Sequence, residues 1–187
     1  MKKKFSPLII LLVVLVLLIG KGVGTYNRLV KADENVNHQW AQVENVLKRR
    51  ADLIPNLVNT VKGYANHEKD VLTEVTQARA AVQNAQGPKE QAEANAELNK
   101  ALGNINVVVE AYPELKADKN FQNLQAELAG TENRIAVERK RYNDVVSSFN
   151  QDVRRFPTSI YAGILGFHQK PYFEISSEDA KTPEVSF

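Results

Sequence analysis

The sequence predicts an all-α protein in which an N-terminal transmembrane helix is followed by an antiparallel up-and-down four-helix bundle. Two patterns support this fold class: an unbroken apolar run lies near the N-terminus, and apolar residues then recur at spacings of three and four. No segment shows the apolar and polar alternation that is typical of a half-buried β-strand. The chain has 187 residues, of which about 150 follow the apolar run, enough to bury a core without disulfide bonds.

The apolar run is long enough to span a membrane. Residues 8–19 are twelve uninterrupted apolar residues, and extending the run to residues 5–23 gives a helix of roughly 29 Å, close to the thickness of the hydrocarbon layer. Lys21 then lies near the far end, where its side chain reaches the lipid headgroups. We therefore expect residues 1–25 to form a lysine-rich cytoplasmic start and an anchor in the lipid bilayer.

A cleaved signal peptide is the alternative interpretation of this segment. The lysines at residues 2–4 precede the run, and a small-x-small sequence at residues 22–24 follows it. We favour an anchor because this site matches the usual A-x-A cleavage sequence poorly. In both interpretations the positive-inside rule keeps the N-terminus in the cytoplasm and places Thr25 and the residues after it outside.

The first helical run of the bundle is expected from Tyr26 to about Ala85. Pro55 interrupts this run, because proline has no N–H and its ring clashes with the carbonyl of Ala51. Either the helix kinks near Pro55, or it is divided there and restarts with Asp52 as the N-cap. We favour a kink because the apolar stripe keeps its register across the proline.

Two further helices are expected at residues 88–112 and 119–155. Proline marks their limits: Pro88 suits the first position of a helix, and the residues before Pro113 and Pro157 avoid the α region. The short connections favour antiparallel packing of neighbouring helices within one chain.

The helical domain is expected to comprise residues 26–175. The short apolar segment at residues 160–167 is expected to cap the bundle, and the polar tail at residues 176–187 to be disordered. Sustained seven-residue repeats also fit a two-chain coiled coil, so self-association is an alternative to packing within one chain.

Several motifs resemble those of a known family. They are WAQVE at residues 40–44, RADLIPNLV at 50–58, AYPELKA at 111–117 and GTENRI at 130–135. In this order, over roughly residues 26–174, the sequence resembles the LemA family of bacterial envelope proteins. The resemblance implies an N-terminal anchor in the bacterial cell membrane and a four-helix bundle, and it supplies no catalytic or binding residues.

The composition argues against several classes of function. The chain has no cysteine, which excludes thiolate catalysis and cysteine-based metal sites. Four of the 24 basic residues flank the apolar run, and the rest of the chain has 20 basic against 22 acidic residues, so we expect no nucleic-acid surface. The three histidines are far apart, and Val71 stands where an H-E-x-x-H motif starting at His67 needs histidine. We expect no catalytic, metal or cofactor site and no enzymatic activity.

Charged residues on the apolar stripes form a candidate buried polar cluster of Arg50, Glu68, Glu132 and Glu138. A buried charge destabilises a fold unless it is paired, so Arg50 is expected to pair with Glu138 or Glu132 and to set the helix register. The alternative is that the stripe drifts around the helix, by about 20° per heptad, and carries these side chains to solvent.

Aromatic residues after Pro157 form a candidate partner patch of Tyr161, Phe167, Tyr172 and Phe173. The alternative is that they cover the end of the bundle as core residues. The expected function is that of a membrane-anchored, non-enzymatic interaction or scaffold module for an unknown envelope protein. Two alternatives stay open: a substrate or adaptor of a membrane protease, and a ligand-binding helical bundle.

Overall fold

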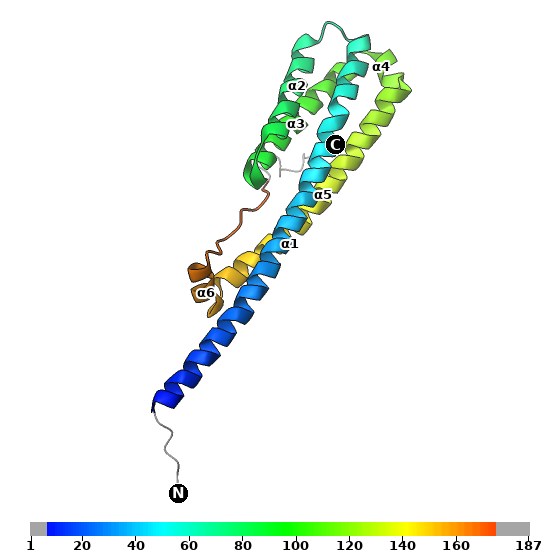
Figure 1. Cartoon of the computed structure of the whole chain (residues 1–187). Coiled ribbons are helices and arrows are strands. Elements are labelled where there is room, and N and C mark those ends of the chain that lie inside the picture. The colour runs from blue at the N-terminus through cyan, green and yellow to red at the C-terminus, as the bar shows by residue number, and fades with distance from the viewer. Residues whose placement is uncertain (1–6, 175–187) are drawn as a thin grey trace, which may run out of the picture. The chain divides into compact units, whose positions relative to one another are not determined.

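The structure, a computed structural model, describes residues 7–174. Within this range the chain forms α-helices and no β-strand (Figure 1). The helices are α1 (Pro7–Tyr64), α2 (Lys69–Asn84), α3 (Gly87–Glu110), α4 (Pro113–Ala117), α5 (Lys119–Arg154) and α6 (Thr158–Leu165). The prediction of an all-α protein with a long apolar N-terminal helix is confirmed. The expected tail at residues 176–187 and the lysines at residues 2–4 lie outside the described residues.

The chain forms two compact units, and the two longest helices, α1 and α5, contribute residues to both. The first unit contains residues 7–38 together with Asp144–Lys170, so it includes α6. The second unit contains Gln39–Asn143 and residues 171–174, so it includes α2, α3 and α4.

The apolar N-terminal run and Pro55 belong to one helix, α1, which continues without a break to Tyr64. The alternative that the helix is divided near Pro55 is therefore wrong, and so is the expectation of one helical run from Tyr26 to about Ala85. The division lies at residues 65–68 instead, after which α2 begins. Two residues of low helix propensity lie here: Gly63 in the last turn of α1, and Asn66 within the division.

A hydrogen bond to the carbonyl oxygen of Ala51 explains why α1 continues past Pro55. Pro55 cannot donate to the carbonyl four residues earlier, and Ala51 is fully buried. The Nε–H of Arg79, on α2, donates to this oxygen at 2.9 Å. Arg79 thus supplies the donor that Pro55 lacks, and the buried carbonyl keeps a hydrogen-bond partner.

Replacing Arg79 with methionine is expected to lower the free energy of unfolding by about 1–3 kcal/mol, because the buried Ala51 carbonyl loses its donor. In a chain that also carries Pro55→Ala, the new N–H at residue 55 bonds to Ala51, so Arg79→Met costs less. Urea unfolding followed by far-UV circular dichroism on the wild type, both single variants and the double variant measures the difference. An equal cost in both backgrounds would contradict this role of Arg79.

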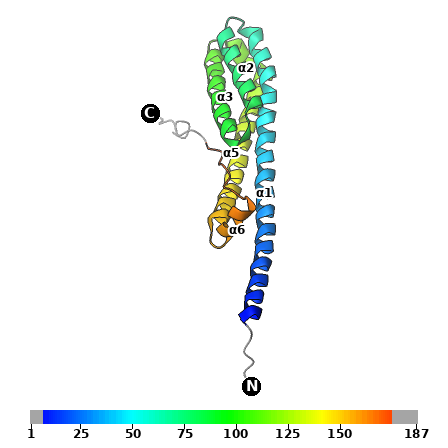
Figure 2. The ribbon, with the colours of Figure 1, turned by 60° about the vertical axis from the view of Figure 1, so that its left-hand side comes forward.

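The core of the second unit is built from one face of each of its helices. Figures 1 and 2 show α2 and α3 lying side by side. The amide of Gln91 closes the turn between them by donating to the carbonyls of Val82 at 3.1 Å and Ala85 at 3.0 Å, near the end of α2. Buried apolar residues from all the helices of this unit form one cluster, which includes Ile54, Val61, Val75, Leu98, Ile105, Leu115 and Phe121.

In the first unit, α6 packs against α1 (Figure 2). Thr158 and Ala162, four residues apart, form the buried side of α6. Arg28, on α1, donates to the hydroxyl of Thr158 at 3.0 Å. Just after α6, the ring of Phe167 meets that of Tyr26 edge to face, with the ring centroids 6.1 Å apart. The apolar segment after Pro157 is therefore a short helix held by polar and aromatic contacts with α1.

Candidate functional site

Arg50 is a charged side chain on an otherwise apolar face of α1. The seven-residue repeat places it between Val43 and Leu57, and only 5% of Arg50 is exposed. Its Nη1 donates to the Oδ1 of Asn95 at 2.9 Å, and its Nη2 donates to the Oδ1 of Asn99. The two asparagines are four residues apart on α3, so one face of that helix presents both amides to the guanidinium.

Glu132, on α5, supplies the charge that balances Arg50. Its carboxylate forms an ion pair with the Nη1 of Arg50. Burial lowers the pKa of Arg50, and the neighbouring Glu132 acts in the opposite direction. A guanidinium stays protonated even when it is buried, so the carboxylate and the two amides offset the cost of removing it from water. The Nε of Arg50 has no hydrogen-bond partner within residues 7–174.

A pocket of about 270 Å³ opens beside this ion pair, within the second unit. Polar groups line one part of it, namely Arg50, Asn99, Asn106, Gln125 and Glu132. Apolar side chains line the rest, among them Leu57, Leu102, Ile105 and Leu128. This mixture of donors, acceptors and apolar surface suits a small polar molecule. Across the described residues, no group of three His, Asp or Glu side chains is arranged to hold a metal ion.

The other two members of the predicted polar cluster have different partners. Glu68, just before α2, accepts a hydrogen bond from the hydroxyl of Tyr112 at 3.2 Å. Glu138, on α5, accepts from the amide of Gln39 at 2.7 Å and pairs with Arg141 at 2.7 Å. The structure thus brings only two of the four predicted residues together. In a straight α-helix, residues seven apart do not lie at the same angle around the axis, so successive positions of the stripe contact different neighbours.

The four aromatic residues of the predicted partner patch are divided between the two units. In the first unit, Tyr161 and Phe167 are half-buried. In the second unit, Phe173 is 2% exposed with its ring centroid 6.0 Å from that of Trp40, whereas Tyr172 is 37% exposed. Phe173 is therefore a core residue, while the other three keep accessible surface.

Two asparagines on α5, which were not among the predicted site residues, hold the extended segment that follows α6. Asn150 donates to the carbonyl of Lys170 at 2.9 Å and accepts from its N–H at 2.8 Å. Asn143 makes the same two bonds with Phe173, at 3.0 and 2.9 Å. Each asparagine satisfies both backbone groups of one residue, as a neighbouring β-strand would. Their seven-residue spacing, directly after Tyr142 and Phe149, is the signal that the sequence offered.

Tyr142 completes the attachment of this segment in the second unit. Its hydroxyl donates to the carbonyl of Pro171 at 2.8 Å, and its ring centroid lies 5.2 Å from that of Trp40. Burial raises the pKa of Tyr142 to about 12, because a phenolate would be poorly solvated at this position.

Stability is expected to fall above pH 10 because of Tyr142. An unfolded tyrosine ionises near pH ~10, whereas Tyr142 in the folded chain ionises near 12. The folded state therefore favours the neutral phenol, and this contribution is present below pH ~10 and lost as the pH rises toward 12. Ultraviolet absorbance titration should show a late-ionising tyrosine that is missing in Tyr142→Phe, and this variant should lose less stability over the same range. An identical late component in both chains would contradict the prediction.

These observations define a class of protein: within residues 7–174 it is all-α, and one helix in this range, α1, is long and apolar enough to cross a membrane. The model of the LemA family matches residues 39–187. The chain belongs to the LemA family, and this confirms the resemblance seen in its motifs.

Individual relatives are similar at lower identity. The chain is 27% identical over 167 residues to protein LemA of Metamycoplasma hominis, a match that covers 87% of this chain and 76% of that protein. It is 26% identical over 175 residues to the magnetosome proteins MamQ 1 and MamQ 2 of Paramagnetospirillum magneticum, covering 80% of this chain and 64% of each relative. This chain therefore spans less than two thirds of the length of the MamQ relatives.

Proposed function

We propose that this protein is a single-pass membrane protein of the bacterial cell envelope, whose extracytoplasmic helical domain is a non-enzymatic interaction or scaffold module. The exposed apolar surface of α1 carries the proposal, because every residue from Leu8 to Ile19 is between 47% and 70% exposed. Proteins in water rarely expose a helix that is apolar on all sides. A lipid bilayer is the environment that such a helix requires.

Contacts at the end of the apolar run and just after it support a retained anchor rather than a cleaved signal peptide. The hydroxyl of Tyr161 donates to the carbonyl of Leu18 at 3.3 Å, and its ring lies against Gly22. Cleavage after Gly24 would remove both contacts. In this proposal residues 1–25 are the cytoplasmic start and anchor, and residues 26–175 form an antiparallel four-helix bundle that precedes the tail.

The role as an interaction module rests on the anchor and on the family. Relatives of this chain are named as magnetosome proteins. A helical domain tethered by α1 stays near the membrane surface, which raises its effective concentration toward envelope partners. An envelope protein or a second copy of this chain is the partner that we propose.

Accessibility labelling tests the anchor and its orientation. The chain has no cysteine, so single cysteines placed at Lys3 and Asn35 are the only sites for a membrane-impermeant maleimide. We expect Asn35→Cys to be labelled in intact spheroplasts and Lys3→Cys only after the membrane is broken. Reversed labelling would contradict the orientation, and release of the protein by alkaline carbonate would contradict the anchor.

Crosslinking in native membranes tests the interaction. Photo-crosslinking the full-length chain and identifying the products should recover a specific envelope protein or a second copy. The matched control is residues 1–25 fused to an unrelated domain, which keeps the anchor and should not recover the same product. Equal recovery by both chains, or no specific product, would contradict the proposal.

The pocket beside Arg50 favours a second candidate function, the binding of a small polar molecule. Native mass spectrometry of the full-length protein, released from bacterial membranes in mild detergent, should then show a bound species. Arg50→Met should lose this species, whereas Arg49→Met, at an exposed neighbouring position, should keep it. If none of the three chains carried a bound species, that result would contradict this function.

A further inference from the structure

One face of α6 and the residues just before it is apolar and exposed. Ile160 and Ile164 lie four residues apart on α6 and are 54% and 79% exposed, and Phe156, which precedes the helix, is 78% exposed. On the other side of the helix, Thr158 and Ala162 are 6% and 1% exposed. Spacing of four places residues on one side of a helix, so α6 has a buried side and an apolar outer side.

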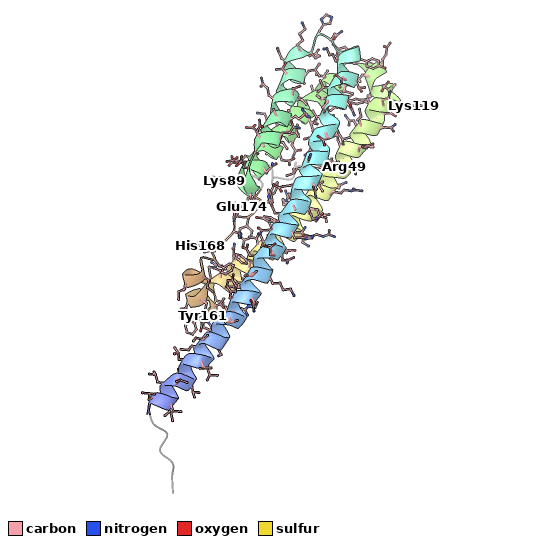
Figure 3. All side chains as sticks on the ribbon, viewed as in Figure 1. Arg49, Lys89, Lys119, Tyr161, His168 and Glu174 are labelled. Atoms are coloured by element: carbon pink, nitrogen blue, oxygen red, sulfur yellow. The ribbon has the colours of Figure 1, made fainter. Side chains whose placement is uncertain are left out.

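This helix is attached at the end of the proposed transmembrane span. Tyr161 reaches the carbonyl of Leu18, which lies within residues 5–23. Gly22 permits the close approach, since a Cβ at this position would lie 3.2 Å from the Tyr161 ring. Figure 3 labels Tyr161 on α6, beside the N-terminal part of α1. Both contacts lie within the first unit, so the position of α6 along α1 is defined.

An apolar groove of about 390 Å³ runs between α1 and α6 at this point. Ile19 and Val23 line it from α1, and Ile164 and Leu165 line it from α6. The groove is continuous with the apolar surface of the span, because Ile19 belongs to both. Whatever surrounds the span therefore also reaches the outer side of α6.

We propose that α6 is a second membrane contact, which lies in the interface between headgroups and acyl chains with its outer side and the groove filled by lipid. The proposal rests on the anchor described above. Leu18 is five residues before the end of the proposed span, a distance of about 7.5 Å along a helix. Helices that lie in the interface immerse their apolar side by about 5–10 Å, so α6 is at the right depth.

The residues around α6 match this environment. Arg154 and Arg155 stand just before it and are exposed, and Lys21 lies on α1 at the same end. Basic residues at this depth attract anionic headgroups, and aromatic rings such as those of Tyr26 and Tyr161 are typical of membrane interfaces. These features favour a bilayer that contains anionic lipid over a protein partner for this surface.

Depth measurements on the full-length chain in nanodiscs of zwitterionic and anionic phospholipid test the proposal. The natural absence of cysteine allows one nitroxide label per chain, at Ile164, at Leu12 within the span or at Asn35 on the exposed surface of α1. Collisions with oxygen, which concentrates in lipid, are compared with collisions with a water-soluble nickel chelate. We expect the label at Ile164 to be reached by oxygen and protected from nickel, as at Leu12, and the label at Asn35 to show the reverse.

The possible results distinguish failure of the membrane contact at α6 from failure of the transmembrane anchor. A label at Ile164 that nickel reaches as readily as at Asn35, while Leu12 is in lipid, would overturn the inference and leave the anchor intact. Protection of Ile164 from both reagents would also overturn it, because protein and not lipid would then cover the surface. A label at Leu12 in water would refute the anchor.

A pair of glycine variants checks that the contact with α1 sets the depth of α6. Gly22→Leu introduces a side chain where the Tyr161 ring lies, whereas Gly20→Leu meets no atom within 4 Å of its Cβ. Both changes keep the span apolar. We expect the Ile164 label to lose its protection from nickel in Gly22→Leu and to keep it in Gly20→Leu. Unchanged protection in Gly22→Leu would contradict the role of this contact.

Discussion

Replacing Arg50 with methionine is expected to lower the free energy of unfolding by about 2–3 kcal/mol, or roughly 5–10 °C in the midpoint of thermal unfolding. Methionine fills much of the same volume, so the loss comes from polar groups and not from a cavity. The amide oxygens of Asn95 and Asn99 lose their donor, and Glu132 loses its counter-charge. Thermal unfolding of the full-length chain in detergent micelles, followed by far-UV circular dichroism, measures the change.

Two further variants separate the contribution of Arg50 from general effects of substitution. Arg49→Met removes the same charge at the neighbouring exposed position labelled in Figure 3, and should change stability by less than about 0.5 kcal/mol. Glu132→Gln keeps the shape of the side chain and should cost less than Arg50→Met, because 43% of the Glu132 side chain is exposed and water screens the pair. Unchanged or increased stability in Arg50→Met would refute an obligate pair.

Replacing Phe173 with alanine is expected to cost about 3 kcal/mol, because it empties a position that is 2% exposed and leaves the ring of Trp40 without its neighbour. The lost packing also weakens the hold on the segment after α6, to which Asn143 and Tyr142 are hydrogen-bonded. Fluorescence of Trp40, the single tryptophan of the chain, reports the local change, and urea unfolding reports the loss of stability.

Tyr172→Ala is the matched control, since it removes an aromatic ring from the adjacent position, which is 37% exposed. We expect this variant to lose less than about 1 kcal/mol and to leave the Trp40 emission unchanged. Equal losses in the two variants would show that the segment is held by its backbone bonds, and that burial of Phe173 contributes little.

The extended segment after α6 is bound to α5 by two asparagine side chains. The sequence predicted only that its aromatic residues form a partner patch or part of the core, whereas in the structure Asn150 and Asn143 bind both backbone groups of Lys170 and of Phe173. The position of this segment therefore depends on the hydrogen bond from the neutral hydroxyl of Tyr142, which is lost at high pH, and on the packing of Phe173. Substitutions at Asn143, Tyr142 or Phe173 are all expected to loosen the same segment, residues 170–173.

Local sequence patterns predicted the helix limits well where glycine and proline set them. The helix expected at residues 88–112 is observed as Gly87–Glu110, and the helix expected at 119–155 is observed as Lys119–Arg154. Pro55 is the exception, because its effect depends on a donor that comes from another helix. With Arg79 in place, a strong local break signal has no consequence for the continuity of α1.

The candidate site was predictable only in part. The stripe position of Arg50 indicated a charge on a buried face, and two glutamates were equally plausible as its partner. The structure selects Glu132 and adds Asn95 and Asn99, because the rotation of α3 and α5 about their own axes turns these side chains toward Arg50. No pattern along a single helix contains that rotation.

The sequence by itself determined the helical class, the apolar run in α1 and membership in the LemA family. All three depend on the order and spacing of residues along the chain, which local physics converts into helices and burial. Tertiary structure alone decided that α1 continues past Pro55, which residues surround Arg50, what holds the segment after α6, and which side of α6 stays exposed. These depend on contacts between residues far apart in the chain, and such contacts are set by how whole helices pack against one another.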